Sequence, residues 1–81
     1  MANEINEFFK QFEKDSAEMK KEIPDAISGF SGMFGKIMKD GAVSLKCKEL
    51  IALAIGLSLQ CEPCIKLHTK KSVDAGASRG E

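Results

Sequence analysis

The sequence predicts an all-α fold of about four helices. Apolar residues recur at steps of three and four along most of the chain, which is the spacing of one face of a helix. Proline and glycine residues stand between the apolar stretches, where they suit helix starts and helix ends. No segment shows the alternation of apolar and polar residues that is typical of a strand. Together these observations indicate helices joined by short connections.

The chain is short and electrically balanced. It has 81 residues, with 12 basic and 12 acidic side chains and a formal net charge of +0. A chain without excess positive charge lacks the electrostatic footprint of a nucleic-acid-binding protein, so we expect no nucleic-acid partner. We expect one domain over residues 1–81, because this length leaves no room for a second core.

No segment resembles a membrane span or a secretion signal. The longest apolar stretch, Leu50–Leu59, is well short of the roughly 18 to 20 residues that cross a bilayer. The N-terminal residues mix acids with aromatics and lack a basic region followed by an apolar run. We therefore expect a cytoplasmic protein with no membrane partner. In that reducing setting, closely spaced cysteines are more often catalytic or metal-binding than structural.

The first predicted helix covers Asn3–Glu22. Its apolar side chains fall on one stripe: Ile5, Phe8, Phe9, Phe12 and Met19. Pro24 interrupts this helix, because the residue before a proline is driven out of the helical region. The same proline suits the first turn of a second helix, with Asp25 placing favourable negative charge near its N-terminus.

The second helix is predicted to begin at Pro24. Its apolar face consists of Ile27, Phe30, Phe34, Ile37 and Met38. Three glycines weaken it by about 1 kcal/mol each relative to alanine. Lys39 is expected to be its last-turn cation and Gly41 its C-terminal stop.

The third helix is predicted from Leu45 to about Gln60, with Ser44 as its N-cap. Its central part, Leu50–Leu57, is apolar on every side, and such a helix must be surrounded by other protein. A chain of this length can hardly cover it alone. We therefore expect a homo-oligomer in which this helix lies near the contact between subunits.

The fourth helix is predicted to start in Cys61-Glu62-Pro63-Cys64 and to close at Ala75-Gly76-Ala77. Pro63 suits the first turn, because a proline there sacrifices no intrahelical hydrogen bond. The helix dipole favours thiolate over thiol at the two cysteines. His68 follows Cys64 by four residues, so the two cysteines and the histidine share one face. A histidine so placed can take the proton of a cysteine, which makes Cys64 the better nucleophile and Cys61 its resolving partner.

Glu49 is a candidate partner for His68. It is the only acid between Leu45 and Cys61. If the third and fourth helices run antiparallel, helix geometry leaves an axial offset of about 7 to 8 Å between the two residues. That offset predicts a water-bridged contact rather than a direct one. A carboxylate there would orient His68 and raise its basicity.

The sequence resembles one known family from about Pro24 to the C-terminus. The resemblance rests on three segments: Lys48-Glu49-Leu50-Ile51-Ala52-Leu53-Ala54, Cys61-x-x-Cys64-x-x-x-His68 and Ala75-Gly76-Ala77. In combination they are similar to the alkylhydroperoxidase D-like branch of the carboxymuconolactone decarboxylase family. The resemblance assigns residues 24–81 to the family core and residues 1–22 to an additional N-terminal helix.

The resemblance implies a thiol peroxidase and disulfide reductase on an all-helical fold that assembles into trimers or hexamers. Cys64 would be the peroxidatic cysteine and Cys61 the resolving one, while His68 and Glu49 would form a proton relay. The substrate would be a peroxide. A lipoyl group or a thioredoxin-like protein would supply the reducing dithiol, and no cofactor or metal is implied.

Other interpretations of the same residues stay open. Cys61, Cys64 and His68 could bind zinc, with Cys47 as a fourth ligand, although ligands within one helix rarely converge tetrahedrally. The chain could also be a non-catalytic oligomeric module. Cys47 is most simply a buried or half-buried apolar residue.

The relay residues also have structural interpretations. His68 taken alone is compatible with a hydrogen-bonded core histidine. Glu49 taken alone is compatible with a first-turn acid that complements the helix dipole. The spacing of His68 from Cys64 favours the chemical interpretation of His68, whereas that of Glu49 depends on the family resemblance.

Overall fold

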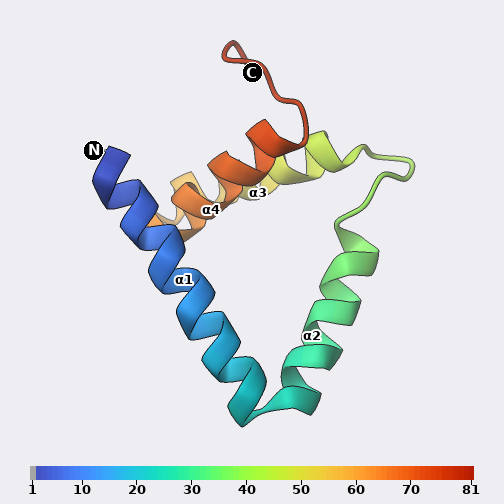
Figure 1. Cartoon of the computed structure of the whole chain (residues 1–81). Coiled ribbons are helices and arrows are strands. Elements are labelled where there is room, and N and C mark those ends of the chain that lie inside the picture. The colour runs from blue at the N-terminus through green and yellow to red at the C-terminus, as the bar shows by residue number, and fades with distance from the viewer. Residues whose placement is uncertain (1) are drawn as a thin grey trace. The chain divides into compact units, whose positions relative to one another are not determined.

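The computed structural model describes residues 2–81, which form four α-helices and no strand (Figure 1). The helices are α1 (Ala2–Glu22), α2 (Pro24–Ile37), α3 (Leu45–Ser58) and α4 (Glu62–Asp74). The all-α prediction is therefore confirmed. The chain divides into two compact units, Met1–Ile37 and Met38–Glu81, which are described separately.

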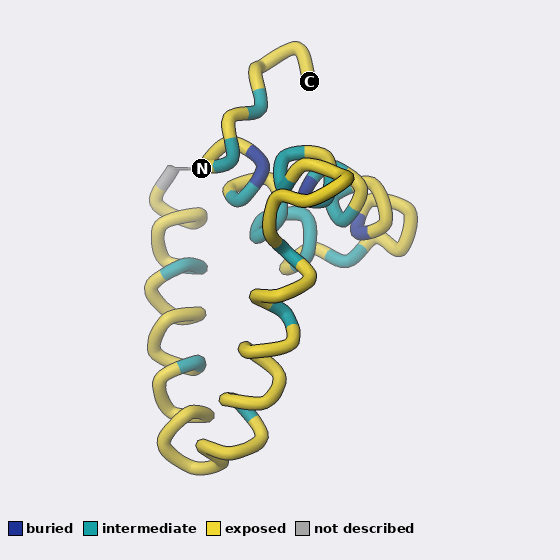
Figure 2. Tube along the Cα trace, turned by 90° about the vertical axis from the view of Figure 1, so that its right-hand side faces the viewer, coloured by how far each residue is buried: buried dark blue, intermediate teal, exposed yellow. Residues whose placement is uncertain are grey.

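The first unit contains α1 and α2, joined almost without a break. The backbone N–H of Ile23 donates to the carbonyl of Met19 at 2.8 Å, and that of Ile27 donates to the carbonyl of Ile23 at 3.1 Å. Pro24 and Asp25 stand in the first turn of α2, as the sequence predicts. No residue of α2 is buried. Both helices are largely exposed along their length (Figure 2).

Helix α2 is shorter than predicted. It ends at Ile37 with Lys36 as its last-turn cation, so the predictions for Lys39 and Gly41 are wrong. The reason lies in the connection to α3. The ammonium group of Lys48 donates to the carbonyl of Lys39 at 2.8 Å, and the N–H of Gly41 donates to the carbonyl of Val43 at 3.2 Å. The backbone groups of Lys39 and Gly41 are therefore used in hydrogen bonds of the connection and of α3. They do not extend α2, whose glycines already lower its helix stability.

The second unit is an antiparallel pair formed by α3 and α4, which lie side by side (Figure 1). Near the turn Gly56 lies against Cys64, and farther along Glu49 meets His68. The buried residues of this pair are Glu49, Gly56 and Ser72. Figure 2 shows them as short dark segments in helices that are otherwise intermediate or exposed. Of the candidate site residues, Glu49 is therefore buried, whereas Cys61, Cys64 and His68 are half-buried.

Ser44 caps α3, as predicted. Its side-chain oxygen accepts a hydrogen bond from the backbone N–H of Cys47 at 3.1 Å, which satisfies one of the free donors of the first turn. The backbone of Ser44 is extended, with φ −67° and ψ 154°. A fixed N-terminus of α3 places Glu49 in the second turn of the helix.

Helix α3 ends at Ser58, two residues before the predicted Gln60. Gln60 adopts the left-handed conformation with φ 53°, and its N–H donates to the carbonyl of Leu57 at 3.1 Å. The N–H of Cys61 donates to the carbonyl of Gly56 at 2.9 Å. This pair of bonds is a Schellman motif, in which a non-glycine residue occupies the position that usually favours glycine. The turn passes directly into α4, whose N-cap is Cys61.

Helix α4 ends in the same motif, with glycine at the left-handed position. Gly76 has φ 102° and its N–H donates to the carbonyl of Val73 at 3.0 Å. The N–H of Ala77 donates to the carbonyl of Ser72 at 2.9 Å. The predicted closure at Ala75-Gly76-Ala77 is confirmed, because only glycine takes this conformation without strain.

The described residues bury no hydrophobic side chain completely. In α3 the exposed fractions of Ile51, Ile55 and Leu57 are 55%, 56% and 55%. The apolar surface of α3 is therefore not covered within the second unit, and the expected homo-oligomer stays a prediction. None of the helices described for residues 2–81 combines the length and apolar character needed to cross a membrane.

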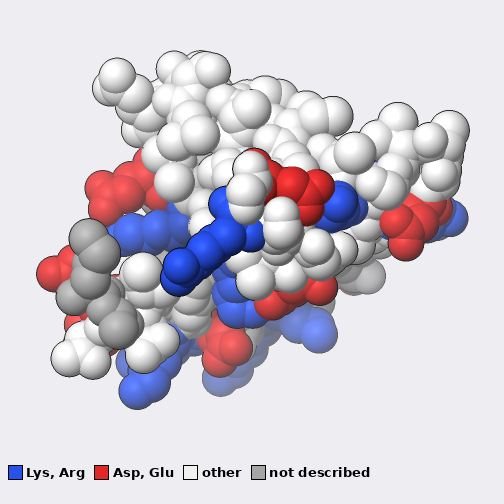
Figure 3. All heavy atoms as spheres, turned by 90° about the horizontal axis from the view of Figure 1, so that it is seen from above, with Lys and Arg blue, Asp and Glu red and all other residues white. Residues whose placement is uncertain are grey.

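Ion pairs lie on the surface of the second unit. They join Lys46 to Glu81 at 2.7 Å, Lys66 to Glu62 at 3.1 Å and Lys70 to Asp74 at 2.7 Å. Figure 3 likewise shows basic and acidic side chains next to one another at several places on the face drawn. Exposed pairs of this kind contribute little to stability, because solvent screens the charges.

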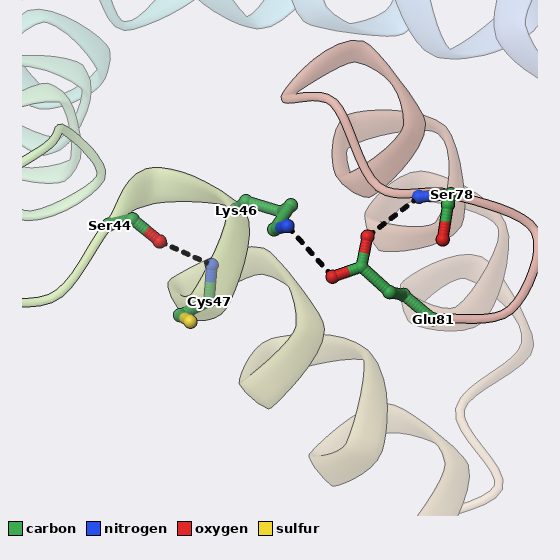
Figure 4. A network of polar contacts seen from close by, with 5 residues as sticks. All are labelled: Ser44, Lys46, Cys47, Ser78 and Glu81. Carbon is green, nitrogen blue, oxygen red and sulfur yellow. Dashed lines mark hydrogen bonds and ion pairs between the residues drawn. The ribbon is translucent and has the colours of Figure 1, made fainter.

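The Lys46 pair belongs to a network that attaches residues 78–81 to the first turn of α3 (Figure 4). The carboxylate of Glu81 accepts from the ammonium group of Lys46 and from the backbone N–H of Ser78, at 2.7 and 2.8 Å. The hydrogen bond from Lys46, followed by that from Ser78, lowers the pKa of Glu81 from 4.5 to about 2. The same contact raises the pKa of Lys46 above 10.5.

We expect the attachment of residues 78–81 to persist in mild acid. A carboxyl whose folded pKa is lowered stabilises the fold above its ordinary pKa, and this contribution disappears as the pH falls through the folded pKa. The Ser78 amide signal in NMR spectra should therefore titrate with a midpoint near pH 2. In Lys46→Met the midpoint should move towards 4.5, the ordinary value. An unchanged midpoint in that variant would contradict the assignment of the shift to Lys46.

Candidate active site

Cys61 and Cys64 are joined by a disulfide, with their Cα atoms 5.3 Å apart. Cys61 is the N-cap of α4 and Cys64 lies in its first turn, after Pro63. Both cysteines are half-buried. The first turn of a helix favours negative charge, so the reduced pair would have thiolates stabilised by the N-terminal end of α4. The arrangement can therefore alternate between a dithiol and a disulfide.

Glu49 and His68 are in direct hydrogen-bond contact. The Nδ1 atom of His68 lies 2.8 Å from the Oε2 atom of Glu49. The side chains are 16% exposed for His68 and 4% exposed for Glu49. The sequence-based expectation of a bridging water is therefore wrong, although the pairing of the two residues is as expected.

The error arose from the end of α3. The axial offset of about 7 to 8 Å holds only if all residues between Glu49 and Cys61 are helical. In the structure α3 stops at Ser58. The axial path from Glu49 to the end of α3 is about 13.5 Å, and that from the start of α4 to His68 is about 9 Å. The remaining offset of about 4.5 Å is short enough for a glutamate side chain to span.

This hydrogen bond orients the imidazole ring. When Nδ1–H donates to a carboxylate, the opposite ring nitrogen, Nε2, is the one that can accept a proton. His68 also lies one helical turn after Cys64 on α4. A base held in this way by Glu49 is suited to receive a proton from a nearby thiol or to return one to a leaving group.

Ser72 is a site neighbour that the sequence analysis did not identify. Its hydroxyl donates to the carbonyl of His68 at 2.7 Å, and the residue is 3% exposed. The spacing of four residues from His68 was an available signal, because serine in a helix often bonds to the carbonyl one turn earlier. Ser72 therefore contributes to the fixed position of the His68 backbone.

The arrangement of the cysteines does not match the zinc alternative. Cys47 is exposed and lies in the first turn of α3, at the opposite end of that helix from Cys61. The expectation that Cys47 is buried or half-buried is therefore wrong, because the first turn of α3 leaves its side chain outside the helix pair. Across residues 2–81, no three His, Cys, Asp or Glu side chains are grouped so that they could hold a metal ion.

Comparisons with known proteins agree on one family. Residues 24–81 match the sequence profile of the Carboxymuconolactone decarboxylase family. The crystal structure of an apo carboxymuconolactone decarboxylase family protein from Legionella pneumophila is 35% identical, with a TM-score of 0.88. That match covers 96% of this chain and 70% of the Legionella chain.

Two curated relatives are uncharacterised proteins. The one from Cupriavidus necator is 34% identical over 56 residues, which are 69% of this chain and 50% of the relative. The one from Haemophilus influenzae is 30% identical over 72 residues, which are 89% of this chain and 64% of the relative. The chain thus spans between half and two thirds of the length of these relatives.

Proposed function

The chain belongs to the carboxymuconolactone decarboxylase family, and on this premise we propose that it is a thiol-dependent peroxidase and disulfide oxidoreductase of the alkylhydroperoxidase D-like branch. The observation that carries the proposal is the Cys61–Cys64 disulfide at the start of α4, the helix that also bears His68, whose ring is hydrogen-bonded to Glu49 of α3. The decarboxylase branch of the family does not rely on a Cys-x-x-Cys pair, so the dithiol favours the peroxidase branch.

Cys64 is the proposed nucleophile. Its thiolate attacks one oxygen of a peroxide, so that an S–O bond forms and the O–O bond breaks. The leaving oxygen takes a proton and departs as water or an alcohol. Cys64 is thereby oxidised to a sulfenic acid, and the peroxide is reduced.

The Glu49–His68 pair serves the proton transfers of this step. His68 accepts the thiol proton of Cys64 and returns a proton to the leaving oxygen, while Glu49 stabilises the protonated ring. The Glu49 carboxylate is buried and hydrogen-bonded directly to Nδ1 of His68, so the orientation of the His68 ring is maintained through the cycle. Positioned acid–base groups of this kind contribute about 10²- to 10⁴-fold to rates.

Cys61 is the proposed resolving residue. Its sulfur attacks the sulfenic sulfur of Cys64, so that the S–S bond forms and water leaves. An external dithiol then reduces the disulfide by two successive exchange steps and becomes a disulfide itself. Lipoyl groups or a thioredoxin-like protein are the dithiols that the resemblance suggests.

We also propose that the protein works as a homo-oligomer, a trimer or hexamer by the same resemblance. The support within the chain is the apolar surface of α3, where Ile51 and Ile55 are more than half exposed. Packing these residues against a second copy of the chain would bury apolar surface that a single short chain leaves exposed. A mass measured by light scattering at the mass of one chain would contradict this proposal.

A peroxide pulse tests the proposed activity. The protein is first reduced and freed of reductant, then treated with a stoichiometric amount of hydrogen peroxide and digested. Mass spectrometry should show loss of two hydrogens from the peptide that contains Cys61 and Cys64, because a disulfide replaces two thiols. The non-catalytic alternative predicts that these thiols react no faster than a free thiol such as glutathione, and that result would overturn the proposal.

A further inference from the structure

Gly56 is the point at which α3 comes closest to the redox pair. A Cβ atom added to Gly56 would lie 3.1 Å from the Cβ of Cys64, and 3.6 Å from the Cys64 carbonyl carbon and the Ile65 nitrogen. The residue is buried. The glycines of α2 differ, because an added Cβ at Gly29 or Gly35 meets nothing within 4 Å. A methyl group at position 56 would therefore be tight against Cys64, which would have to shift by a few tenths of an ångström to admit it.

The same glycine also contacts the other cysteine. Its carbonyl accepts the hydrogen bond from the Cys61 N–H at 2.9 Å. Gly56 thus touches Cys64 through its Cα side and holds Cys61 through its backbone oxygen. It follows Glu49 by seven residues, which is two turns of helix, so both residues lie on the face of α3 that meets α4.

We infer that Gly56 is a positioning residue for the Cys61–Cys64 couple and sets the balance between its disulfide and dithiol forms. The inference rests on the proposed thiol–disulfide chemistry, and it adds a residue that does not itself react. The carbonyl of Gly56 holds the backbone of Cys61 against α3 by a hydrogen bond. Because Gly56 has no side chain, Cys64 can also pack closely against α3. The positions of both cysteines therefore depend on their contacts with one residue, Gly56.

The disulfide form depends on this fit more than the dithiol form does. In the disulfide, the Cβ of Cys64 is tied through two sulfur atoms to Cys61, which Gly56 holds by its hydrogen bond. A methyl group at position 56 would press on that Cβ, so Cys64 would have to shift by a few tenths of an ångström while still tied to Cys61. In the dithiol the two cysteines can separate and accommodate the movement.

The experiment compares Gly56→Ala with the unaltered protein in glutathione redox buffers. The disulfide and two glutathione thiols exchange with the dithiol and one oxidised glutathione, so electrons balance without any peroxide. We expect the equilibrium constant to shift at least tenfold towards the dithiol, which is about 30 mV for a two-electron couple. Gly35→Ala is the matched control and should leave the equilibrium unchanged, since its added methyl group meets nothing within 4 Å.

A purely structural role for Gly56 predicts a different result. It would lower the free energy of unfolding of Gly56→Ala equally in the oxidised and reduced proteins and leave the redox equilibrium unchanged. Equal destabilisation, including failure to fold in both states, would overturn the inference, whereas destabilisation confined mainly to the oxidised state supports it. If the unaltered disulfide exchanges reversibly but the thiols ignore peroxide, the peroxidase proposal fails while the inference about Gly56 is still tested.

Discussion

Replacing Cys64 with serine is expected to abolish peroxide-dependent disulfide formation. A serine hydroxyl at this position is not ionised near neutral pH and cannot replace the thiolate as nucleophile. We expect the rate of peroxide consumption to fall by at least about 10³-fold, as is usual when a nucleophile is removed. Peroxide consumption and free-thiol content, followed together after a peroxide pulse, measure this effect. The fold should be retained, since serine is close in size to cysteine.

Two matched variants separate the roles of the three cysteines. Cys61→Ser should still consume one equivalent of peroxide and should accumulate a sulfenic acid on Cys64, which dimedone traps and mass spectrometry locates. Cys47→Ser should behave like the unaltered protein, because Cys47 lies in the first turn of α3, far from the disulfide. A sulfenic acid on Cys61, or undiminished turnover in Cys64→Ser, would reverse the proposed assignment.

The second large effect is expected for Glu49→Gln. Glutamine has nearly the same shape and can still accept a hydrogen bond from His68, but it carries no charge to stabilise the protonated ring. We expect the rate of Cys64 oxidation by peroxide to fall by about 10²-fold, the lower end of what positioned acid–base groups contribute. Stopped-flow measurement of the reduced protein with excess peroxide gives this rate directly.

His68→Asn is the companion variant for this test. The side-chain amide of asparagine can donate from roughly the position of Nδ1, so the contact with Glu49 is retained, while Nε2 is lost. Activity should therefore fall as far as in Glu49→Gln, with little change in thermal stability. The double variant should be no slower than the slower single variant, because the two residues act as a unit. Fully additive losses would show that Glu49 and His68 contribute independently.

The local signals in the sequence were sufficient for most helix ends. Ser44 correctly predicts the start of α3, because its cap oxygen satisfies a backbone N–H of the first turn. Gly76 correctly predicts the end of α4, because a left-handed glycine satisfies backbone groups within a few residues. The end of α3 was not predictable in this way. Gln60 takes the left-handed conformation without being glycine, so nothing local marked the stop at Ser58.

Most of the candidate site followed from spacing along single helices. Cys61, Cys64 and His68 are related by helical periodicity, and that relation does not depend on the rest of the fold. Whether Glu49 contacts His68 directly depends on where α3 stops and α4 begins. Because the predicted α3 is two residues too long, the predicted distance is too large and implies a bridging water that the structure does not need. Gly56 and Ser72 were missed for a related reason, since their contacts exist only once the helices pair or the backbone is built.

Cys61 is both the residue that completes the turn after α3 and the N-cap of α4. Only Leu59, Gln60 and Cys61 separate the two helices, and each of the three donates a backbone hydrogen bond to α3, so the position of α4 depends on the length of this turn. One residue inserted within Leu59–Cys61 would break the hydrogen bonds that define this turn and change how α4, with His68, lies against Glu49 of α3. The connection over residues 38–44 lies outside this constraint. Variation in length among homologous sequences is therefore compatible with the chemistry there, and incompatible with it at the corner before the disulfide.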